Sequence, residues 1–157
     1  MIRFARKEDM SSVLSLIQEL ADFEKEPDAV IITEEDLLKD GFGVDPKFHC
    51  LVAEKVGTIV GMALFYPRYS TWKGVTLHLE DLIVTQSLRG EGYGKDLYTA
   101  FITFAAEKRV KRIEWVVLDW NTQAIDFYKK SGAHVLDDWN TVQMDENAIA
   151  SYVKSSH

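Results

Sequence analysis

The sequence contains few of the residues that form disulfide bonds and metal sites. Its 157 residues include one cysteine, Cys50, and four histidines, so an intramolecular disulfide is excluded and we predict no metal site. The longest apolar stretch, residues 59–66, is eight residues long with one glycine among them. A membrane-spanning helix needs roughly 18. No signal-peptide pattern follows Met1, and these absences together predict a soluble, cytoplasmic protein without a membrane partner.

Positive charge is also in short supply. Eighteen Lys and Arg stand against 25 Asp and Glu, a formal net charge of −7, which argues against nucleic acid or an anionic membrane as a partner. Residues 19–45 hold ten of the acids and only two lysines. Such a run is usually a solvated helix face; the alternative is an acidic wall that attracts a cationic substrate. With 46% hydrophobic residues, the chain can build a core, and its length predicts a single domain over 1–157.

The spacing of apolar residues predicts a mixed α/β order. Strands are expected over residues 2–5, 50–54, 59–66, 75–84 and 113–118, with one or two more within 134–144. Helices are expected over residues 8–24, after the capping-box sequence Thr33–Asp36, after residue 94, and over 122–131 with Gly132 just beyond its end. Pro67 is expected to end its strand or to mark a bulge.

The glycine-rich stretch Arg89–Gly94 stands between a predicted strand and a predicted helix. A helix start exposes unpaired N–H groups and partial positive charge, and glycines let the backbone approach a pyrophosphate closely. The stretch is not a Walker A loop, because Asp96 follows Gly94-Lys95, and it comes too late in the chain for the dinucleotide fingerprint. From the glycines alone, a turn without a ligand is as good an interpretation as a phosphate loop.

Three segments in order strengthen the phosphate-loop interpretation. Arg89-x-x-Gly92-x-Gly94 resembles the Q/R-x-x-G-x-G/A acyl-CoA pyrophosphate loop of the GNAT N-acetyltransferase family. Residues 79–84 look like the strand that carries the acetyl-CoA arm, and residues 121–133 are similar to the family's N-x-x-A-x-x-F-Y-x-x-x-G-F motif, with alanine in the last position. Further stretches resemble the diamine (spermidine/spermine) acetyltransferase subgroup, which includes thialysine acetyltransferases: residues 37–43, 48–54 and 79–81.

The resemblance implies a fold, a reaction and a cofactor. The fold would be the GNAT acyl-CoA N-acyltransferase fold, a mixed and mostly antiparallel sheet of six to seven strands flanked by about four helices. The reaction would carry acetyl from acetyl-CoA to a primary amine of a small di- or polyamine, or to a lysine-like ω-amine such as thialysine, by direct attack in a ternary complex. A homodimer is also implied. The implied acetyl-CoA contacts are Leu82, Ile83, Val84, Arg89, Gly90, Glu91, Gly92, Tyr93, Gly94, Asn121 and Ala124.

Acetylation of an amine needs a proton acceptor and a proton donor. An alkylammonium has a pKa near 10.4, so only about one molecule in 10³ is free amine at pH 7.4. Glu80, an acid in an otherwise apolar strand, is the predicted base; the alternative is a strand-edge acid paired with a cation such as Arg68. By resemblance, Tyr128 is the general acid that protonates the leaving CoA thiolate, and its alternative is packing beside Phe127.

Binding of the cationic amine is assigned to acids and aromatic residues near the same cleft. Besides Glu80, the candidates are Phe23, Glu24, Trp72, Asp81 and Asp119. Phe23 stands where similar polyamine enzymes carry tyrosine, so the sequence does not rank the amines. Two other functions stay open: acetylation of another small amine or of a protein amino group, and a non-catalytic acyl-CoA sensor.

Overall fold

The computed structural model describes residues 1–156, which fall into two compact units that divide after Val116. The first unit holds one five-stranded sheet in the order β1-β2-β3-β4-β5, antiparallel except for the parallel β4–β5 pair. The strands are β1 (Ile2–Phe4), β2 (His49–Lys55), β3 (Thr58–Ser70), β4 (Gly74–Val84) and β5 (Ile113–Glu114). Its α-helices are α1 (Met10–Phe23), α2 (Glu34–Phe42) and α3 (Tyr93–Glu107). The expectation of a single domain stays a prediction.

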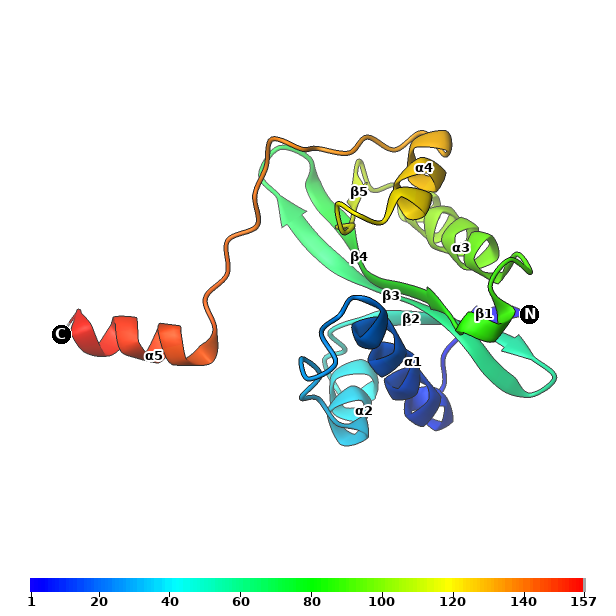
Figure 1. Cartoon of the computed structure of the whole chain (residues 1–157), viewed down its shortest axis with the longest axis horizontal. Coiled ribbons are helices and arrows are strands. Elements are labelled where there is room, and N and C mark those ends of the chain that lie inside the picture. Colours follow the sequence, from blue (N-terminus) through cyan, green and yellow to red (C-terminus); the bar gives the residue numbers. More distant parts are fainter. Residues whose placement is uncertain (157) are drawn as a thin grey trace. The chain divides into compact units, whose positions relative to one another are not determined.

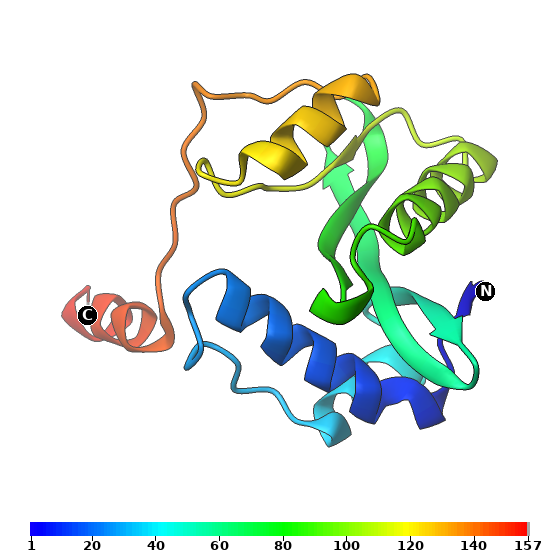
Figure 2. The same ribbon diagram turned by 45° about the vertical axis from the view of Figure 1, so that its right-hand side comes forward.

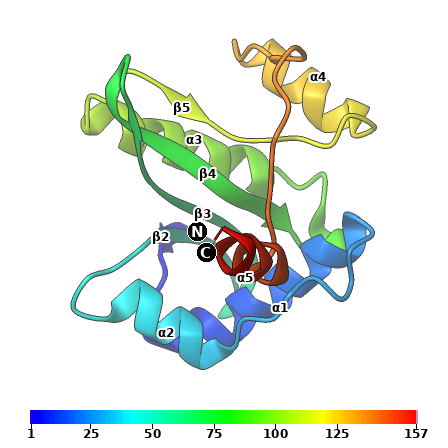
Figure 3. The ribbon, with the colours of Figure 1, turned by 90° about the vertical axis from the view of Figure 1, so that its left-hand side faces the viewer.

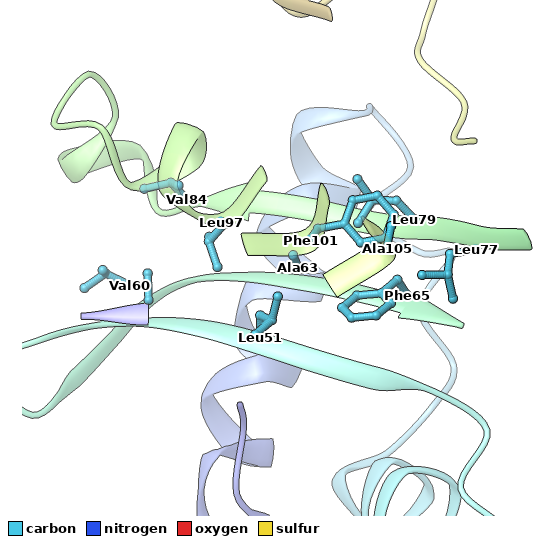
Figure 4. Packing of buried hydrophobic residues seen from close by; sticks show 11 residues of the cluster. Leu51, Val60, Ala63, Phe65, Leu77, Leu79, Val84, Leu97, Phe101 and Ala105 are labelled. Atoms are coloured by element: carbon cyan, nitrogen blue, oxygen red, sulfur yellow. The ribbon is translucent and has the colours of Figure 1, made fainter. Parts of the chain in front are cut away.

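Helices cover both faces of this sheet, α1 and α2 on one side and α3 on the other (Figures 1 and 3). On the α3 side, Phe65 of β3 packs with Leu97 and Phe101 of α3, all three fully buried (Figure 4). On the α1 side, Met10 and Val13 pack with apolar residues of β2 and β3. Each face therefore buries its own apolar cluster, which fixes both the register and the positions of the helices.

A β-bulge on β4 changes which residues face which side of the sheet. Leu79 pairs with Phe65 and Asp81 pairs with Leu64, so Glu80 is an extra residue on β4. The β4 residues that pack toward α3 are therefore odd-numbered before the bulge and even-numbered after it: Leu77, Leu79, Leu82 and Val84. Directly paired residues share a face, and Leu64 belongs to the α1-side cluster. Asp81 thus faces α1, where unbroken alternation would have turned it toward α3.

Local signals in the sequence are confirmed at several element ends. Thr33 and Asp36 form the predicted capping box of α2, each side chain accepting a hydrogen bond from the other residue's N–H. The predicted turn between β2 and β3 contains Val56 and Gly57, both with positive φ. Pro67 does not end β3; it pairs with Leu77, beyond the end of the β2–β3 ladder, where β3 is an edge strand and a missing N–H costs no hydrogen bond.

The strand count differs from the expected six to seven. The strand predicted over 113–118 has two residues, and residues 134–144 contain no strand. Residues 134–144 are exposed throughout, with Val142 at 90%, so this apolar run is not buried against a neighbour in the described chain. In the shorter strand region Val116 is 76% exposed, whereas Ile113 and Trp115 pack against the α3-side core.

The second unit contains two helices, α4 (Thr122–Lys130) and α5 (Glu146–Ser155). Residues 1–156 therefore contain five α-helices rather than about four. Gly132 follows α4 with φ +102°, as predicted for the residue beyond a helix end. Helix α5 was not expected from the sequence. Asp145 caps it by accepting a hydrogen bond from Ala148 N at 2.8 Å, and this cap ahead of Ile149 and Tyr152 was a usable signal.

Candidate active site

Three polar side chains meet beside the bulge, on the α1 side of the sheet. The Tyr66 hydroxyl donates a 2.8 Å hydrogen bond to Glu80 Oε2, and His78 Nε2 lies 3.5 Å from the same oxygen. Burial, followed by this hydrogen bond, raises the pKa of Tyr66 to about 12, so the hydroxyl keeps its proton and orients the carboxylate. Half of the Glu80 side chain is exposed, so water reaches it. No motif in the sequence indicates Tyr66 or His78, which meet Glu80 only because β3 pairs with β4.

The alternative interpretation of Glu80, an ion pair with Arg68, is wrong. Arg68 Nη1 instead lies 2.6 Å from Glu114 Oε1, on the strand beyond β4. Among the described residues, no lysine or arginine forms an ion pair with Glu80. Its carboxylate is therefore available to a cation from outside.

Asp81 and Glu24 add two more carboxyl groups to this region. Burial raises the pKa of Asp81 to about 6, and the charges of Glu80 and then Glu24 add to that shift. Partial burial also raises the pKa of Glu24, which follows the last residue of α1. Each acid therefore holds its negative charge at a cost, and a bound ammonium group would lower that cost.

The end of β4 is tied to α1. Thr85 Oγ1 donates to the Glu19 carboxylate at 3.0 Å, and Gln86 N donates to Glu19 Oε1 at 2.8 Å. Glu19 lies one helical turn before Phe23, the last residue of α1, which Glu24 follows. Glu19, like Tyr66 and His78, carries no signal in the sequence, since its partners lie 66 and 67 residues away.

The loop after β4 has the backbone form that a phosphate site requires. Gly90 and Gly92 have φ of +85° and +93°, and Gly92 is the N-cap of α3. In Figure 2 the loop is part of the green segment that connects β4 to α3. A Cβ placed on either residue would meet nothing within 4 Å, so the space beside both is open. The first N–H groups of α3 have no partner within the helix and carry partial positive charge. The arrangement suits an anionic oxygen ligand.

Arg89 holds the loop against the rest of the first unit. Its Nε donates a 3.1 Å hydrogen bond to Val84 O, and its guanidinium lies 5.2 Å above the ring of Phe23. Phe23, predicted to contact the amine, therefore also supports the glycine loop. At the other side of the loop, Glu91 pairs with Lys55 at 2.9 Å, an exposed ion pair of small energetic weight.

The outer edge of β4 is open where the acetyl-CoA arm is predicted to lie. The β4–β5 ladder contains only the pairs Leu77–Ile113 and His78–Glu114, and in the first unit no strand pairs with β4 on that edge beyond His78. The backbone groups of residues 82–84 on this edge can therefore bind a ligand. Leu82 is partly buried, and Ile83 and Val84 are buried, so their side chains anchor the strand.

Four of the predicted site residues belong to the second unit. Asn121 is the N-cap of α4 and accepts a 3.4 Å hydrogen bond from Ala124 N, which confirms the capping interpretation. Tyr128 is partly buried on α4, with its ring 5.8 Å from that of Phe127. Asp119 is exposed. Trp72 is 80% exposed in the hairpin between β3 and β4, in the first unit. The predicted roles of these residues stay predictions.

The one cysteine is not a nucleophile candidate. Burial, followed by the charges of Asp9 and Asp81, raises the pKa of Cys50 to about 12, so the thiol stays protonated.

The described residues contain no group of three or more His, Cys, Asp or Glu side chains placed to hold a metal ion. None of the described helices has the length and apolarity to cross a bilayer.

Known proteins match nearly the whole chain. The thialysine N-epsilon-acetyltransferase of Bos taurus is 40% identical over 160 residues, covering 95% of this chain and 94% of that protein. The spermidine/spermine N(1)-acetyltransferase-like protein 1 of Homo sapiens is 38% identical over 139 residues, covering 84% of this chain and 20% of that protein. An integron cassette protein from the mobile metagenome of V. cholerae has the same fold, with a TM-score of 0.79, 22% identity, and coverage of 98% and 97% of the two chains.

The family model described as acetyltransferase (GNAT) family matches residues 11–133. This match spans the glycine loop, the bulged strand and α4. The predicted fold class is therefore confirmed, although the sheet has five strands in the described chain. With most of its length matched, and with relatives at 40% identity, the chain belongs to the GNAT family of acetyltransferases.

Proposed function

We propose that the protein transfers an acetyl group from acetyl-CoA to a primary amine of a small molecule, with thialysine as the first candidate and a di- or polyamine as the second. Relatives at 38–41% identity carry names for these activities. One observation carries the proposal: a loop built for phosphate oxygens follows directly on a strand whose bulge gathers carboxyl groups. The loop suits coenzyme A, and the carboxyl groups suit a cationic amine.

At the cofactor end, the open N–H groups at the start of α3 bind the pyrophosphate, and residues 82–84 bind the pantetheine arm through their backbone. Gly90 and Gly92 provide the left-handed backbone and the open space that this approach needs. Arg89 acts chiefly as a positioning residue, since its Nε is already bonded to Val84 O. In the second unit, Asn121 and Ala124 are the proposed further contacts of coenzyme A.

Valine at Gly92 should therefore weaken coenzyme A binding at least about tenfold, because a β-branched residue is strained at φ +93° and the loop would change shape. Isothermal titration calorimetry with coenzyme A measures the effect. Gly74→Val is the matched control: Gly74 has φ +78° and open space, but it lies in the β3–β4 hairpin. Unchanged affinity in a folded Gly92→Val protein contradicts the proposed loop function.

At the amine end, Asp81 and Glu24 hold the ammonium group and Glu80 accepts its proton through water. Glu80 suits the base role because it is half exposed and oriented by Tyr66. Asp81 suits the anchor role because it is partly buried, so a neighbouring cation offsets the cost of its charge. Phe23 and Asp119 are the remaining proposed amine contacts.

Acetyl transfer then proceeds by direct attack of the amine on the thioester. The amine nitrogen attacks the thioester carbon, the C–N bond forms, and the C–S bond breaks as the tetrahedral intermediate collapses. Glu80 accepts, through water, the proton whose loss turns the ammonium group into a free amine. The leaving thiolate takes a proton from the Tyr128 hydroxyl, the proposed general acid, and the second proton, which the nitrogen loses as it becomes an amide, returns to the Tyr128 oxygen.

We also propose that the protein works as a cytoplasmic homodimer. Support for self-association comes from exposed apolar side chains in the second unit, among them Leu136, Trp139 and Val142. A second copy of the chain is the proposed cover for this segment, and acids of that copy would reach the amine site.

A thiol-release assay with a panel of amines tests the proposed substrate class. We expect thialysine, spermidine or putrescine to exceed a lysine-containing peptide at least about tenfold in kcat/KM, because the small acidic site recognises a compact cation. A peptide that outperforms every small amine favours a protein amino group as the acceptor. Coenzyme A binding without thiol release for any amine favours the non-catalytic sensor.

A further inference from the structure

A cavity lies at the far end of α3 from the glycine loop. It has a volume of about 460 Å³, within the range of small-molecule sites, and all of its walls belong to the first unit. The glycine loop caps the first residue of α3, whereas the cavity is lined by Phe104 and by residues 108–111 after the helix. Because α3 has 15 residues, the helix separates the two sites by roughly 20 Å.

Four cationic side chains line this cavity, and no acidic residue does. Lys108, Arg109 and Lys111 follow α3, and Lys73 comes from the hairpin between β3 and β4. Throughout residues 1–156, no carboxylate oxygen lies within ion-pair distance of any of these four groups. This concentration of unpaired positive charge occurs in a chain whose net charge is −7.

Stabilisation of the α3 dipole does not account for the whole cluster. Cations after a helix C-terminus are favourable, which explains Lys108 and its neighbours. Lys73, however, comes from a different element 35 residues earlier and lines the same cavity. The charge of Lys108 adds to burial in lowering the pKa of His49, another lining residue, so positive potential extends into the cavity itself.

The rest of the lining is apolar. Leu77 of β4 is buried and lines the cavity, and Val75, Val110 and the ring of Phe104 complete its apolar wall. Lys108 Nζ lies 5.4 Å above the Phe104 ring, so the charged and apolar parts of the wall are in contact. A ligand that satisfies both parts has an anionic group joined to a compact apolar body.

We propose that this cavity is a binding site for a small organic anion, a phosphate or carboxylate group carried on an apolar body of roughly ring size. The site is separate from the acyl-CoA loop, and its charge repels the cationic amine substrate. The inference does not rest on the proposed acetylation reaction, because every residue that carries it lies outside the candidate active site.

Calorimetry with four probes tests the site: phenyl phosphate, benzoate, inorganic phosphate and benzyl alcohol. We expect phenyl phosphate or benzoate to bind with a dissociation constant of about one millimolar or below. Inorganic phosphate, which lacks the apolar body, and benzyl alcohol, which lacks the anionic group, should both bind more weakly. Which of the two aromatic anions binds better distinguishes a phosphate ligand from a carboxylate ligand.

The double variant Lys73→Gln with Lys111→Gln should weaken that binding at least about tenfold. Both side chains are exposed, so the variant should fold. Lys7→Gln with Lys39→Gln is the matched control, with the same change in net charge at exposed positions of the first unit that do not line the cavity, and it should bind as the wild type does.

Three results would overturn the proposal. The first is that neither aromatic anion binds at a concentration of about 10 mM, roughly tenfold above the expected dissociation constant. The second is equal weakening in the control double variant, which would reduce the effect to overall charge. The third is loss of binding when coenzyme A is added, which would move the anion to the glycine loop.

Discussion

Phenylalanine in place of Tyr128 should slow acetyl transfer about 10²–10⁴-fold, the usual contribution of a general acid, while the affinity for acetyl-CoA barely changes. The substitution keeps the ring that packs 5.8 Å from Phe127 and removes only the hydroxyl that would protonate the leaving thiolate. Steady-state rates with one good amine measure the loss, and calorimetry with coenzyme A measures the affinity.

Tyr69→Phe is the control for this experiment. Tyr69 is 72% exposed on β3, so the loss of its hydroxyl should leave the rate and the stability unchanged. Equal rates for Tyr128→Phe and the wild type would remove Tyr128 from the mechanism, and the thiolate would then leave without a protein donor.

Asparagine in place of Asp81 should make the protein more stable and less active at the same time. The folded protein holds the Asp81 proton more tightly than the unfolded chain does, because the pKa is raised to about 6. Ionisation of Asp81 therefore lowers the free energy of unfolding as the pH rises from about 4 through 6, and the deficit persists above that range. Asparagine removes this deficit, so we expect a gain of roughly 1–3 kcal/mol at pH 7.5 that vanishes by pH 3.

The same variant should raise KM for the amine about 10- to 100-fold, since it removes a charged hydrogen-bond partner of the ammonium group. Urea unfolding at pH 3 and pH 7.5, with amine kinetics at pH 7.5, measures both effects. Asp28→Asn, in an exposed turn, should change neither. A stabilised variant with normal KM would show that Asp81 is a strained acid with no part in amine binding, and a destabilised one would contradict the cost assigned to its charge.

Sequence-based reasoning succeeded where the determining contacts are local. The capping box at Thr33 and Asp36, the turn at Val56-Gly57 and the helix end at Gly132 all depend on residues within a few positions of one another. The glycine loop is of the same kind, because its conformation follows from its own residues. The positive φ expected of this loop is confirmed at Gly90 and Gly92, while the binding roles of its residues stay predictions.

The features that were missed depend on pairing between distant segments. The bulge at Glu80 arises from the register of β4 against β3, and Tyr66 reaches Glu80 across 14 residues. Glu19 meets its partners across more than 60 residues. The cationic cavity combines Lys73 with residues after α3, so no continuous motif describes it. The strands expected within 134–144 failed for the same reason, since apolar alternation forms a strand only where a partner strand is present.

The bulge at Glu80 also defines how this enzyme could lose its chemistry in a single genetic event. Deletion of residue 80 would leave Leu79 followed by Asp81, and Leu82 and Val84 would then continue the alternation begun by Leu77 without interruption. Every core side chain of β4 would keep its face, and the glycine loop would keep its place after the strand. Loss of one codon, with no change in hydrophobic pattern, would thus yield a folded acyl-CoA binder that lacks its proposed base. Deletion of Glu80 alone would therefore convert the proposed acetyltransferase into a protein that binds acyl-CoA without transferring the acyl group.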